Sequence, residues 1–275
     1  MDILELKSIT DIRQISHQIF AKGWGEANGG NISIRLPARE LAAVGGQLTA
    51  GKEHPLPFTL PGLAGDHFLV TGTGVFFRHI DQFPEESLGI IRINDRGDGW
   101  SLVWGYLGGG RPTSELSAHL LSHQVRKQVT AGSDTIVLHT HATNLIAISF
   151  VLPLNSAVLT RELWEMMSEC LLLFPDGIGV LDWMLPGQKE IGNATAAMMA
   201  RHRLILWAHH GLFGAGRSMD QLFGLIETAD KAAEMLLKVL AAGGKRQAIS
   251  ASQLRELAAA FHVEPLAEAL YEICE

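Results

Sequence analysis

The chain has 275 residues, of which 47% are apolar, and a formal net charge of −7 at pH 7. This acidic balance, without any cluster of Lys and Arg, argues against a nucleic-acid-binding surface. Two cysteines, Cys170 and Cys274, are too few for a disulfide framework and favour a cytoplasmic protein. We expect no signal peptide and no membrane insertion, because the longest apolar stretch, around 145–154, is too short to span a bilayer.

The first part of the chain predicts a helix, a small-residue turn and a strand. Isoleucines at helical spacing predict a helix over 8–22, and alternation predicts a strand over 32–35. Between them lies Asn28-Gly29-Gly30-Asn31. Such a sequence is typical of an ordinary turn, but its glycines could also let backbone N–H groups approach a phosphate. Residues 37–66, rich in Pro, Gly and Ala, predict a long surface excursion with a short helix near 38–43.

A second small-residue turn, Gly72-Thr73-Gly74, follows a buried-type strand at 68–71. The segments 90–93 and 100–104 are typical of a hairpin. A glycine-rich loop then leads to a helix ending near residue 128, for which Thr113 or Ser114 is the expected N-cap. The start of that helix would offer free N–H groups to an anion. Glu115, in the predicted first turn, could turn its carboxylate toward a cleft.

The same helix contains an alternative metal site. Glu115, His119 and His123 recur every four residues and share one helix face, and two histidines at this spacing can bind zinc. Polar residues at helical spacing more often form a solvated stripe, which is the interpretation we favour here.

Two apolar runs end in histidine pairs. Side chains alternate across a strand, so in the run 136–141 the rings of His139 and His141 should share a face. A catalytic zinc usually has three protein ligands and an open position. The run 204–211 ends in His209-His210-Gly211, where alternation places the two histidines on opposite faces and the glycine favours His210. Three histidines with Glu115 nearby predict a zinc centre.

The rest of the chain is expected to be mainly helical. We predict helices over 142–152, 161–170, 188–202, 218–242 and 251–261, a core strand over 171–174, and a short apolar segment at 178–181. Ser250 with Gln253 forms a capping-box pattern at the start of the last helix. Without an internal repeat or a clear linker, we expect a single α/β domain over 1–275.

The order and spacing of these blocks resemble the class II aldolase/adducin family of sugar-phosphate aldolases. The resemblance covers nearly the whole chain and rests on Asn28-Gly29-Gly30-Asn31, Val70-Thr71-Gly72-Thr73-Gly74, Pro112-Thr113-Ser114-Glu115, His139-Thr140-His141-Ala142-Thr143-Asn144, Glu169-Cys170, Phe174-Pro175-Asp176-Gly177 and His210-Gly211. It implies a three-layer α/β/α fold with a central, largely antiparallel sheet. It also implies a homotetramer with active sites at subunit interfaces.

The resemblance further implies the site residues. One Zn²⁺ per subunit would be held by His139, His141 and His210, with Glu115 as the acid/base and Glu169 as a second carboxylate from the neighbouring subunit. The substrate phosphate would be bound by Asn28, Gly30, Asn31, Thr73, Gly74, Thr113 and Ser114. A member of this family has Ser where this chain has Thr73, and either hydroxyl can bond phosphate.

The implied reaction is the reversible cleavage of a sugar phosphate, L-rhamnulose 1-phosphate, to dihydroxyacetone phosphate and L-lactaldehyde. Breaking the C3–C4 bond leaves negative charge that a metal ion can stabilise. The alternatives are an aldolase or 4-epimerase acting on a related sugar phosphate, a non-catalytic scaffold of the adducin type, and a metal-dependent hydrolase.

Overall fold

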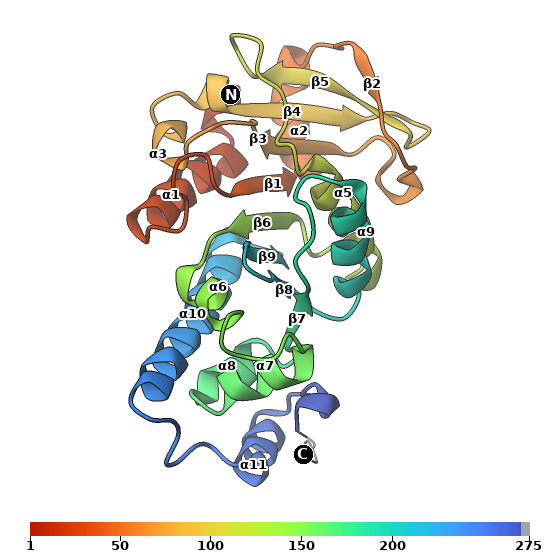
Figure 1. The fold of residues 1–275 in the computed structure, drawn as a ribbon. Coiled ribbons are helices and arrows are strands. Elements are labelled where there is room, and N and C mark those ends of the chain that lie inside the picture. Colours follow the sequence, from red (N-terminus) through yellow and green to blue (C-terminus); the bar gives the residue numbers. More distant parts are fainter. Residues whose placement is uncertain (271–275) are drawn as a thin grey trace. The chain divides into compact units, whose positions relative to one another are not determined.

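A computed structural model describes residues 1–270, so Cys274 lies outside the described part. Contacts within the chain group it into two compact units, which are described separately here (Figure 1). The first unit contains residues 1–141, 185–200 and 215–219, and the second contains 142–184, 201–214 and, of the described residues, those from 220 onward. The single domain expected over 1–275 stays a prediction.

The first unit contains a sheet of antiparallel strands. They are β1 (Asn31–Arg35), β2 (Glu53–Pro55), β3 (His67–Thr71), β4 (Leu88–Ile93), β5 (Gly99–Gly105) and β6 (Ile136–Thr140), in the order β2-β5-β4-β3-β1-β6. The predicted strands and hairpin are confirmed. Strand β2 was not predicted: part of the excursion at 37–66 pairs with β5 at the edge of the sheet.

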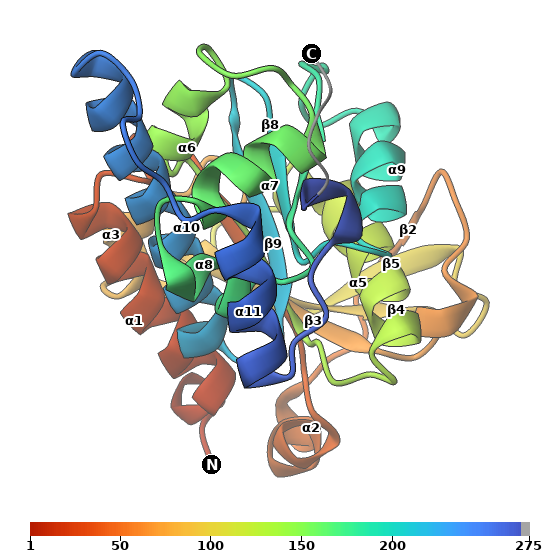
Figure 2. The ribbon, with the colours of Figure 1, turned by 90° about the horizontal axis from the view of Figure 1, so that it is seen from below.

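Helices flank this sheet on both faces. They are η1 (Ile3–Glu5), α1 (Lys7–Ala21), α2 (Ala38–Val44), η2 (Gly45–Gln47), η3 (Pro61–Leu63), α3 (Phe77–Ile80), α4 (Pro84–Ser87), α5 (Leu116–Val129) and α9 (Lys189–Met198). Leu120 of α5 packs into a core with Phe68 and Ile91 of the strands. Leu69, which points to the opposite face, is also fully buried. Figure 2 shows α1 and α5 on opposite sides of these strands.

The second unit is built on shorter strands. Strand β7 (Ile178–Leu181) runs parallel to β8 (Leu204–Trp207), and β9 (Gly211–Gly216) runs antiparallel to β8. The last two residues of β9 and the first of α10 belong to the first unit. The helices are α6 (Thr143–Ile148), α7 (Ser156–Trp164), α8 (Ser168–Leu173), α10 (Met219–Ala241), α11 (Ala251–Phe261) and η4 (Ala267–Ala269).

Two predictions for the second unit are wrong. Residues 171–174 do not form a strand, because Leu171, Leu172 and Leu173 lie in α8. Leu171 is buried while Leu173 is 45% exposed, so this apolar run is a one-sided helix rather than a strand buried on both faces. The predicted helix over 161–170 is divided between α7 and α8, which begins at Ser168.

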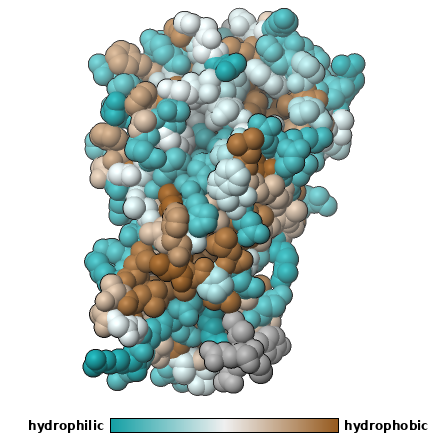
Figure 3. Space-filling view, viewed as in Figure 1, coloured by the Kyte–Doolittle hydropathy of each residue, from teal (hydrophilic) through white to brown (hydrophobic). Residues whose placement is uncertain are grey.

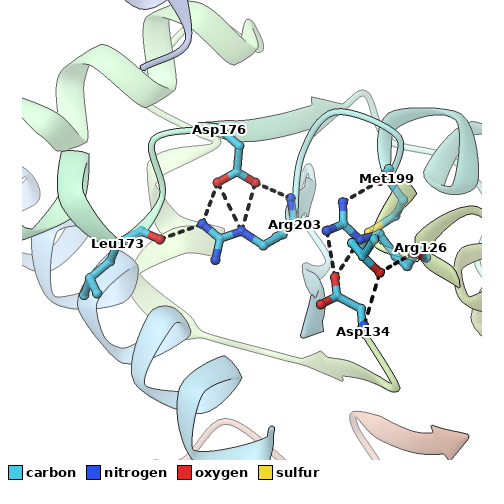
Figure 4. Close-up of polar contacts among 7 residues, drawn as sticks. Arg126, Asp134, Leu173, Asp176, Met199 and Arg203 are labelled. Atoms are coloured by element: carbon cyan, nitrogen blue, oxygen red, sulfur yellow. Dashed lines mark hydrogen bonds and ion pairs between the residues drawn. The ribbon is translucent and has the colours of Figure 1, made fainter. Parts of the chain in front are cut away.

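Ion pairs hold the ends of several of these elements (Figure 4). In the second unit, the carboxylate of Asp176 accepts hydrogen bonds from the backbone N–H and the guanidinium of Arg203, which joins the turn before β7 to the start of β8. In the first unit, Arg126 near the end of α5 donates to the Asp134 carboxylate at 2.7 Å and to the Met199 carbonyl at 2.9 Å. The Arg126–Asp134 pair therefore fixes the loop that leads into β6.

The α/β class with a largely antiparallel sheet is confirmed. Within residues 1–270, β7 and β8 pair in parallel, and the other strand pairs described above are antiparallel. Within the same residues, no helix combines the length and the apolar character needed to cross a membrane.

Candidate active site

The three segments predicted to bind phosphate are hydrogen-bonded to one another within the first unit. The Ile32 N–H donates to the Thr71 hydroxyl at 2.9 Å, which links β1 to the end of β3. Beyond β3, the Thr73 N–H donates to the Arg111 carbonyl at 2.9 Å. The Thr113 N–H donates to the Thr71 carbonyl at 3.0 Å. The turn before β1, the turn after β3 and the start of α5 are thus brought together, while their role in binding phosphate stays a prediction.

Glu115 is itself the N-cap of α5, so the prediction that Thr113 or Ser114 holds this position is wrong. The helix begins one residue later because the Thr113 hydroxyl accepts a 3.3 Å hydrogen bond from the Glu115 N–H, and the Thr113 carbonyl accepts from Leu116. Only 7% of Glu115 is exposed, and its Oε2 accepts from Asn31 Nδ2 at 2.9 Å. Burial raises the pKa of Glu115, although the Asn31 hydrogen bond and nearby His141 partly oppose the shift.

Neither interpretation of the histidines on α5 is correct. His119 and His123 are buried, so they are not a solvated stripe. The Ser33 hydroxyl lies 2.7 Å from His119 Nδ1 and 2.8 Å from His123 Nε2, and His119 Nε2 contacts the Asn31 side-chain oxygen. Burial lowers the pKa of His119 to about 3 and lowers the pKa of His123 well below its ordinary value, so both rings are neutral. These residues form a hydrogen-bond network behind Glu115.

His139 and His141 lie side by side at the end of β6. Their ring centroids are 5.2 Å apart at an interplanar angle of 70°, in agreement with the shared face expected from alternation. His139 is 1% exposed, and its Nε2 is 3.9 Å from the Glu115 carboxylate. The register of β1 and β6 pairs Asn31 with His139. The asparagine that contacts Glu115 therefore also lies opposite the first histidine of the pair.

Two residues of the turn before β1 lie against His141. Glu26 was not predicted as a site residue, and Gly29 was predicted only as part of a turn that could approach a phosphate. Glu26 Oε1 lies 2.6 Å from His141 Nδ1. Gly29 packs so closely that a Cβ atom there would lie 2.8 Å from the His141 ring. The His141 N–H also donates to the Trp24 carbonyl at 3.0 Å. A carboxylate that accepts from one ring nitrogen of a histidine orients the other toward a metal, which is a common arrangement around metal ligands.

His209 and His210 lie in a turn of the second unit, not in a strand as the alternation argument assumed. Strand β8 ends at Trp207, and His209 has a φ of 61°. His209 is held by Ser149, whose hydroxyl lies 3.1 Å from its Nδ1, and its ring contacts Phe150. The His210 ring instead lies 5.3 Å from that of Trp207. The preference for His210 as a ligand stays a prediction, and His209 has a structural role that the turn explains.

The sequence pattern of the family "Class II Aldolase and Adducin N-terminal domain" matches residues 10–237. This chain belongs to that family. It is 48% identical over 252 residues to a rhamnulose-1-phosphate aldolase of Mannheimia succiniciproducens, covering 91% of this chain and 93% of that protein. It is 47% identical over 272 residues to one from Yersinia pseudotuberculosis, covering 98% of each chain. A sugar-phosphate aldolase from Thermotoga maritima has a similar structure, with a TM-score of 0.72 and 28% identity over 86% of this chain and 97% of that one.

Membership of the class II aldolase family confirms the resemblance and the expected fold class. The first unit brings together Glu115, Asn31, His139 and His141, together with the three segments predicted to bind phosphate. Glu169 lies in the first turn of α8 in the second unit. Its predicted role as a carboxylate supplied to a neighbouring subunit stays a prediction.

Proposed function

We propose that this class II aldolase reversibly cleaves L-rhamnulose 1-phosphate to dihydroxyacetone phosphate and L-lactaldehyde. The observation that carries the proposal is the similarity, at 47 to 48% identity over more than 90% of both chains, to proteins named rhamnulose-1-phosphate aldolase. The position of Glu115 beside His139 supports the same chemistry. An aldol cleavage needs a proton donor next to a metal ion that stabilises the developing negative charge, and His139 is a proposed ligand of that ion.

We further propose that one Zn²⁺ per subunit is held by His139, His141 and His210. His139 and His141 lie side by side, with ring centroids 5.2 Å apart, and His210 would supply the third imidazole. The donor set fits zinc, since imidazole suits this ion and three histidines leave an open position for substrate. The Glu26 contact to His141 Nδ1 fits as well, because it leaves Nε2 as the coordinating atom. When bound, the metal would polarise the substrate carbonyl and stabilise the negative charge released on cleavage.

The chain's own residues supply the proton transfers in this proposal. In the cleavage direction the C4 hydroxyl loses its proton, the C3–C4 bond breaks, and its electron pair passes to the carbon and oxygen atoms of the dihydroxyacetone phosphate half. Glu115 then delivers a proton to C3, and in the condensation direction the same carboxylate removes it. A raised pKa makes Glu115 a stronger base than an ordinary carboxylate. Glu169 would accept the proton of the C4 hydroxyl.

The proposed phosphate site uses backbone amides, hydroxyl groups and the start of α5. It comprises Asn28, Gly30, Asn31, Thr73, Gly74, Thr113 and Ser114. Gly30 adopts a φ of 82°, and a Cβ atom there would lie 2.6 Å from the Phe77 ring and 2.9 Å from the His139 carbonyl, so this turn requires glycine. Its backbone can therefore approach a ligand closely.

We also propose that the enzyme works in the cytoplasm as a homotetramer with active sites at subunit interfaces. Apolar side chains gather on one face of the second unit (Figure 3). In the same unit, Phe150 is 68% exposed and Val151 is 53% exposed, directly after α6. Exposed apolar side chains in a cluster are typical of surfaces that contact another protein.

A coupled assay of L-rhamnulose 1-phosphate cleavage, with and without a chelator, tests the proposal. We expect free dihydroxyacetone phosphate to be released, and the activity to be lost with chelator and restored by Zn²⁺. Conversion of the sugar without any release would indicate a 4-epimerase instead. A folded protein that binds no metal and converts no sugar phosphate would favour a scaffold of the adducin type.

The variant Glu115→Gln tests the proton transfer. We expect kcat to fall by about 10² to 10⁴, because general acid–base catalysis typically contributes that factor, while bound metal stays near one equivalent. Gln keeps an oxygen that can accept from Asn31, so the local fold should be retained. Glu190→Gln, which alters an exposed acid in the first turn of α9, is the matched control and should retain full activity. Wild-type turnover by Glu115→Gln would exclude this role.

A further inference from the structure

A single line of hydrogen bonds runs through the first unit from the middle of α5 to the carboxylate of Glu115. His123 contacts the Ser33 hydroxyl at 2.8 Å, and Ser33 contacts His119 at 2.7 Å. His119 contacts the Asn31 oxygen, and the Asn31 amide donates to Glu115 at 2.9 Å. All five side chains are buried, with at most 7% exposed. Buried networks of this kind fix the orientation of their members.

The direction of the line follows from the types of donor and acceptor. The Asn31 oxygen can only accept, so His119 must carry its hydrogen on Nε2. Because the ring of His119 is neutral, its Nδ1 must accept, and the Ser33 hydroxyl must be the donor. Ser33 then has only its oxygen lone pairs left, so His123 Nε2–H donates to it. Every hydrogen in the line points toward Glu115.

We infer that Ser33, His119 and His123 are positioning residues that hold the Asn31 amide with its N–H group toward Glu115. An amide that receives a hydrogen bond on its oxygen from His119 presents its nitrogen to the carboxylate and so favours the ionised form that acts as a base. The inference rests on the proposed function insofar as Glu115 is the acid/base. The placement of the amide can be measured without any turnover.

The alternative is a line of hydrogen bonds that runs in the opposite direction. If the Asn31 amide were turned over, its oxygen would face Glu115, and Glu115 would then have to be protonated. The Asn31 nitrogen would donate to His119 Nε2, and His119 would carry its hydrogen on Nδ1 and donate to Ser33. The two directions therefore predict different tautomers of the same buried ring.

Nuclear magnetic resonance of the holoenzyme with ¹⁵N-labelled histidine distinguishes the two directions. We expect His119 and His123 to show protonated Nε2 and unprotonated Nδ1 at neutral pH, with the signals assigned through His119→Gln and His123→Gln. In Ser33→Ala, His119 loses the donor to Nδ1, and we expect its fixed tautomer to be lost. A protonated Nδ1 on His119 in the wild-type protein would overturn the inference, whether or not the protein is an aldolase.

Kinetics of three serine variants test the consequence for catalysis. We expect Ser33→Ala to lower kcat by about 10- to 100-fold, the usual cost of removing such a supporting partner, with KM and metal content unchanged. Ser33→Thr keeps the hydroxyl and should recover most of the rate. Ser122→Ala is the matched control, because Ser122 is a fully buried serine of α5 whose hydroxyl has no hydrogen-bond partner within residues 1–270.

The outcomes separate this inference from the proposed function. A wild-type enzyme that cleaves no L-rhamnulose 1-phosphate would refute the proposed function, while the tautomer measurement would still decide the orientation of Asn31. An active wild-type enzyme whose Ser33→Ala variant retains full kcat, or loses no more than Ser122→Ala, would refute the positioning role. An equal loss in Ser33→Ala and Ser33→Thr would also refute it, because the hydroxyl would then be irrelevant.

Discussion

The first unit contains two pairs of histidines whose spacing in the sequence is compatible with a shared metal ion. His119 and His123 are four residues apart on a helix, and His139 and His141 are two apart on a strand, so each pair shares one face. In the structure their partners differ. The helix pair contacts neutral groups, the Ser33 hydroxyl and the Asn31 amide oxygen, whereas His141 contacts the carboxylate of Glu26.

The comparison shows that spacing alone does not identify a metal ligand. A neutral imidazole has one donor and one acceptor nitrogen. A ring in the middle of a hydrogen-bond network uses both nitrogens in hydrogen bonds, so neither is left to bind a metal. A ring whose Nδ1 donates to a carboxylate keeps a more basic Nε2 for coordination. The difference therefore lies in what the rest of the fold places beside each ring.

The largest expected effect is a difference in bound metal between variants of the two histidine pairs. We expect His139→Ala to lower the affinity for Zn²⁺ by more than about 100-fold, because losing a ligand should cost more than losing an outer partner. His123→Gln should retain the metal, since Gln keeps an N–H group that can donate to Ser33. Elemental analysis of both purified variants is the measurement. Loss of the metal in His123→Gln, with His139→Ala fully loaded, would reverse the assignment.

The close approach of Gly29 to His141 predicts the next effect. The variant Gly29→Ala places a Cβ atom 2.8 Å from the ring, so the ring must move away from its position beside Glu26. We expect the affinity for Zn²⁺ to fall by about 10- to 100-fold, as measured by competition with a chelator. Gly45→Ala is the control, because no atom of the described part of the chain lies within 4 Å of a Cβ atom there. Equal affinity in both variants would show that the ring's position does not matter.

What could be predicted from the sequence was mainly local. The helix α11 begins and ends where expected, because Ser250 and Gln253 form a capping box within one turn. The shared face of His139 and His141 follows from strand geometry alone. The roles of Ser33 and Glu26 could not be predicted, because the residues they contact are 86 and 115 positions away in the chain. Those contacts depend on the packing of α5 against β1 and of the turn before β1 against the end of β6.

The smallest expected effect concerns the stability of the metal-free protein in acid. The pKa of His119 is about 3 in the folded state and about 6.5 when unfolded. Between these values the unfolded state binds a proton that the folded state excludes, so stability falls as the pH drops from about 6.5 toward 3. Each such histidine contributes up to about 1.4 kcal/mol per pH unit.

Urea denaturation between pH 7 and 4 measures this contribution. We expect the free energy of unfolding to fall less steeply with decreasing pH in His119→Gln than in the wild-type protein, by about 1 kcal/mol per pH unit. His17→Gln, which changes an exposed histidine of α1, is the matched control. Equal slopes in His119→Gln and the wild-type protein would mean that the ring accepts a proton in the folded state. A His119 ring that accepts a proton could not remain neutral between Ser33 and Asn31. The difference between the two histidine pairs would then depend on the contact between Glu26 and His141 alone.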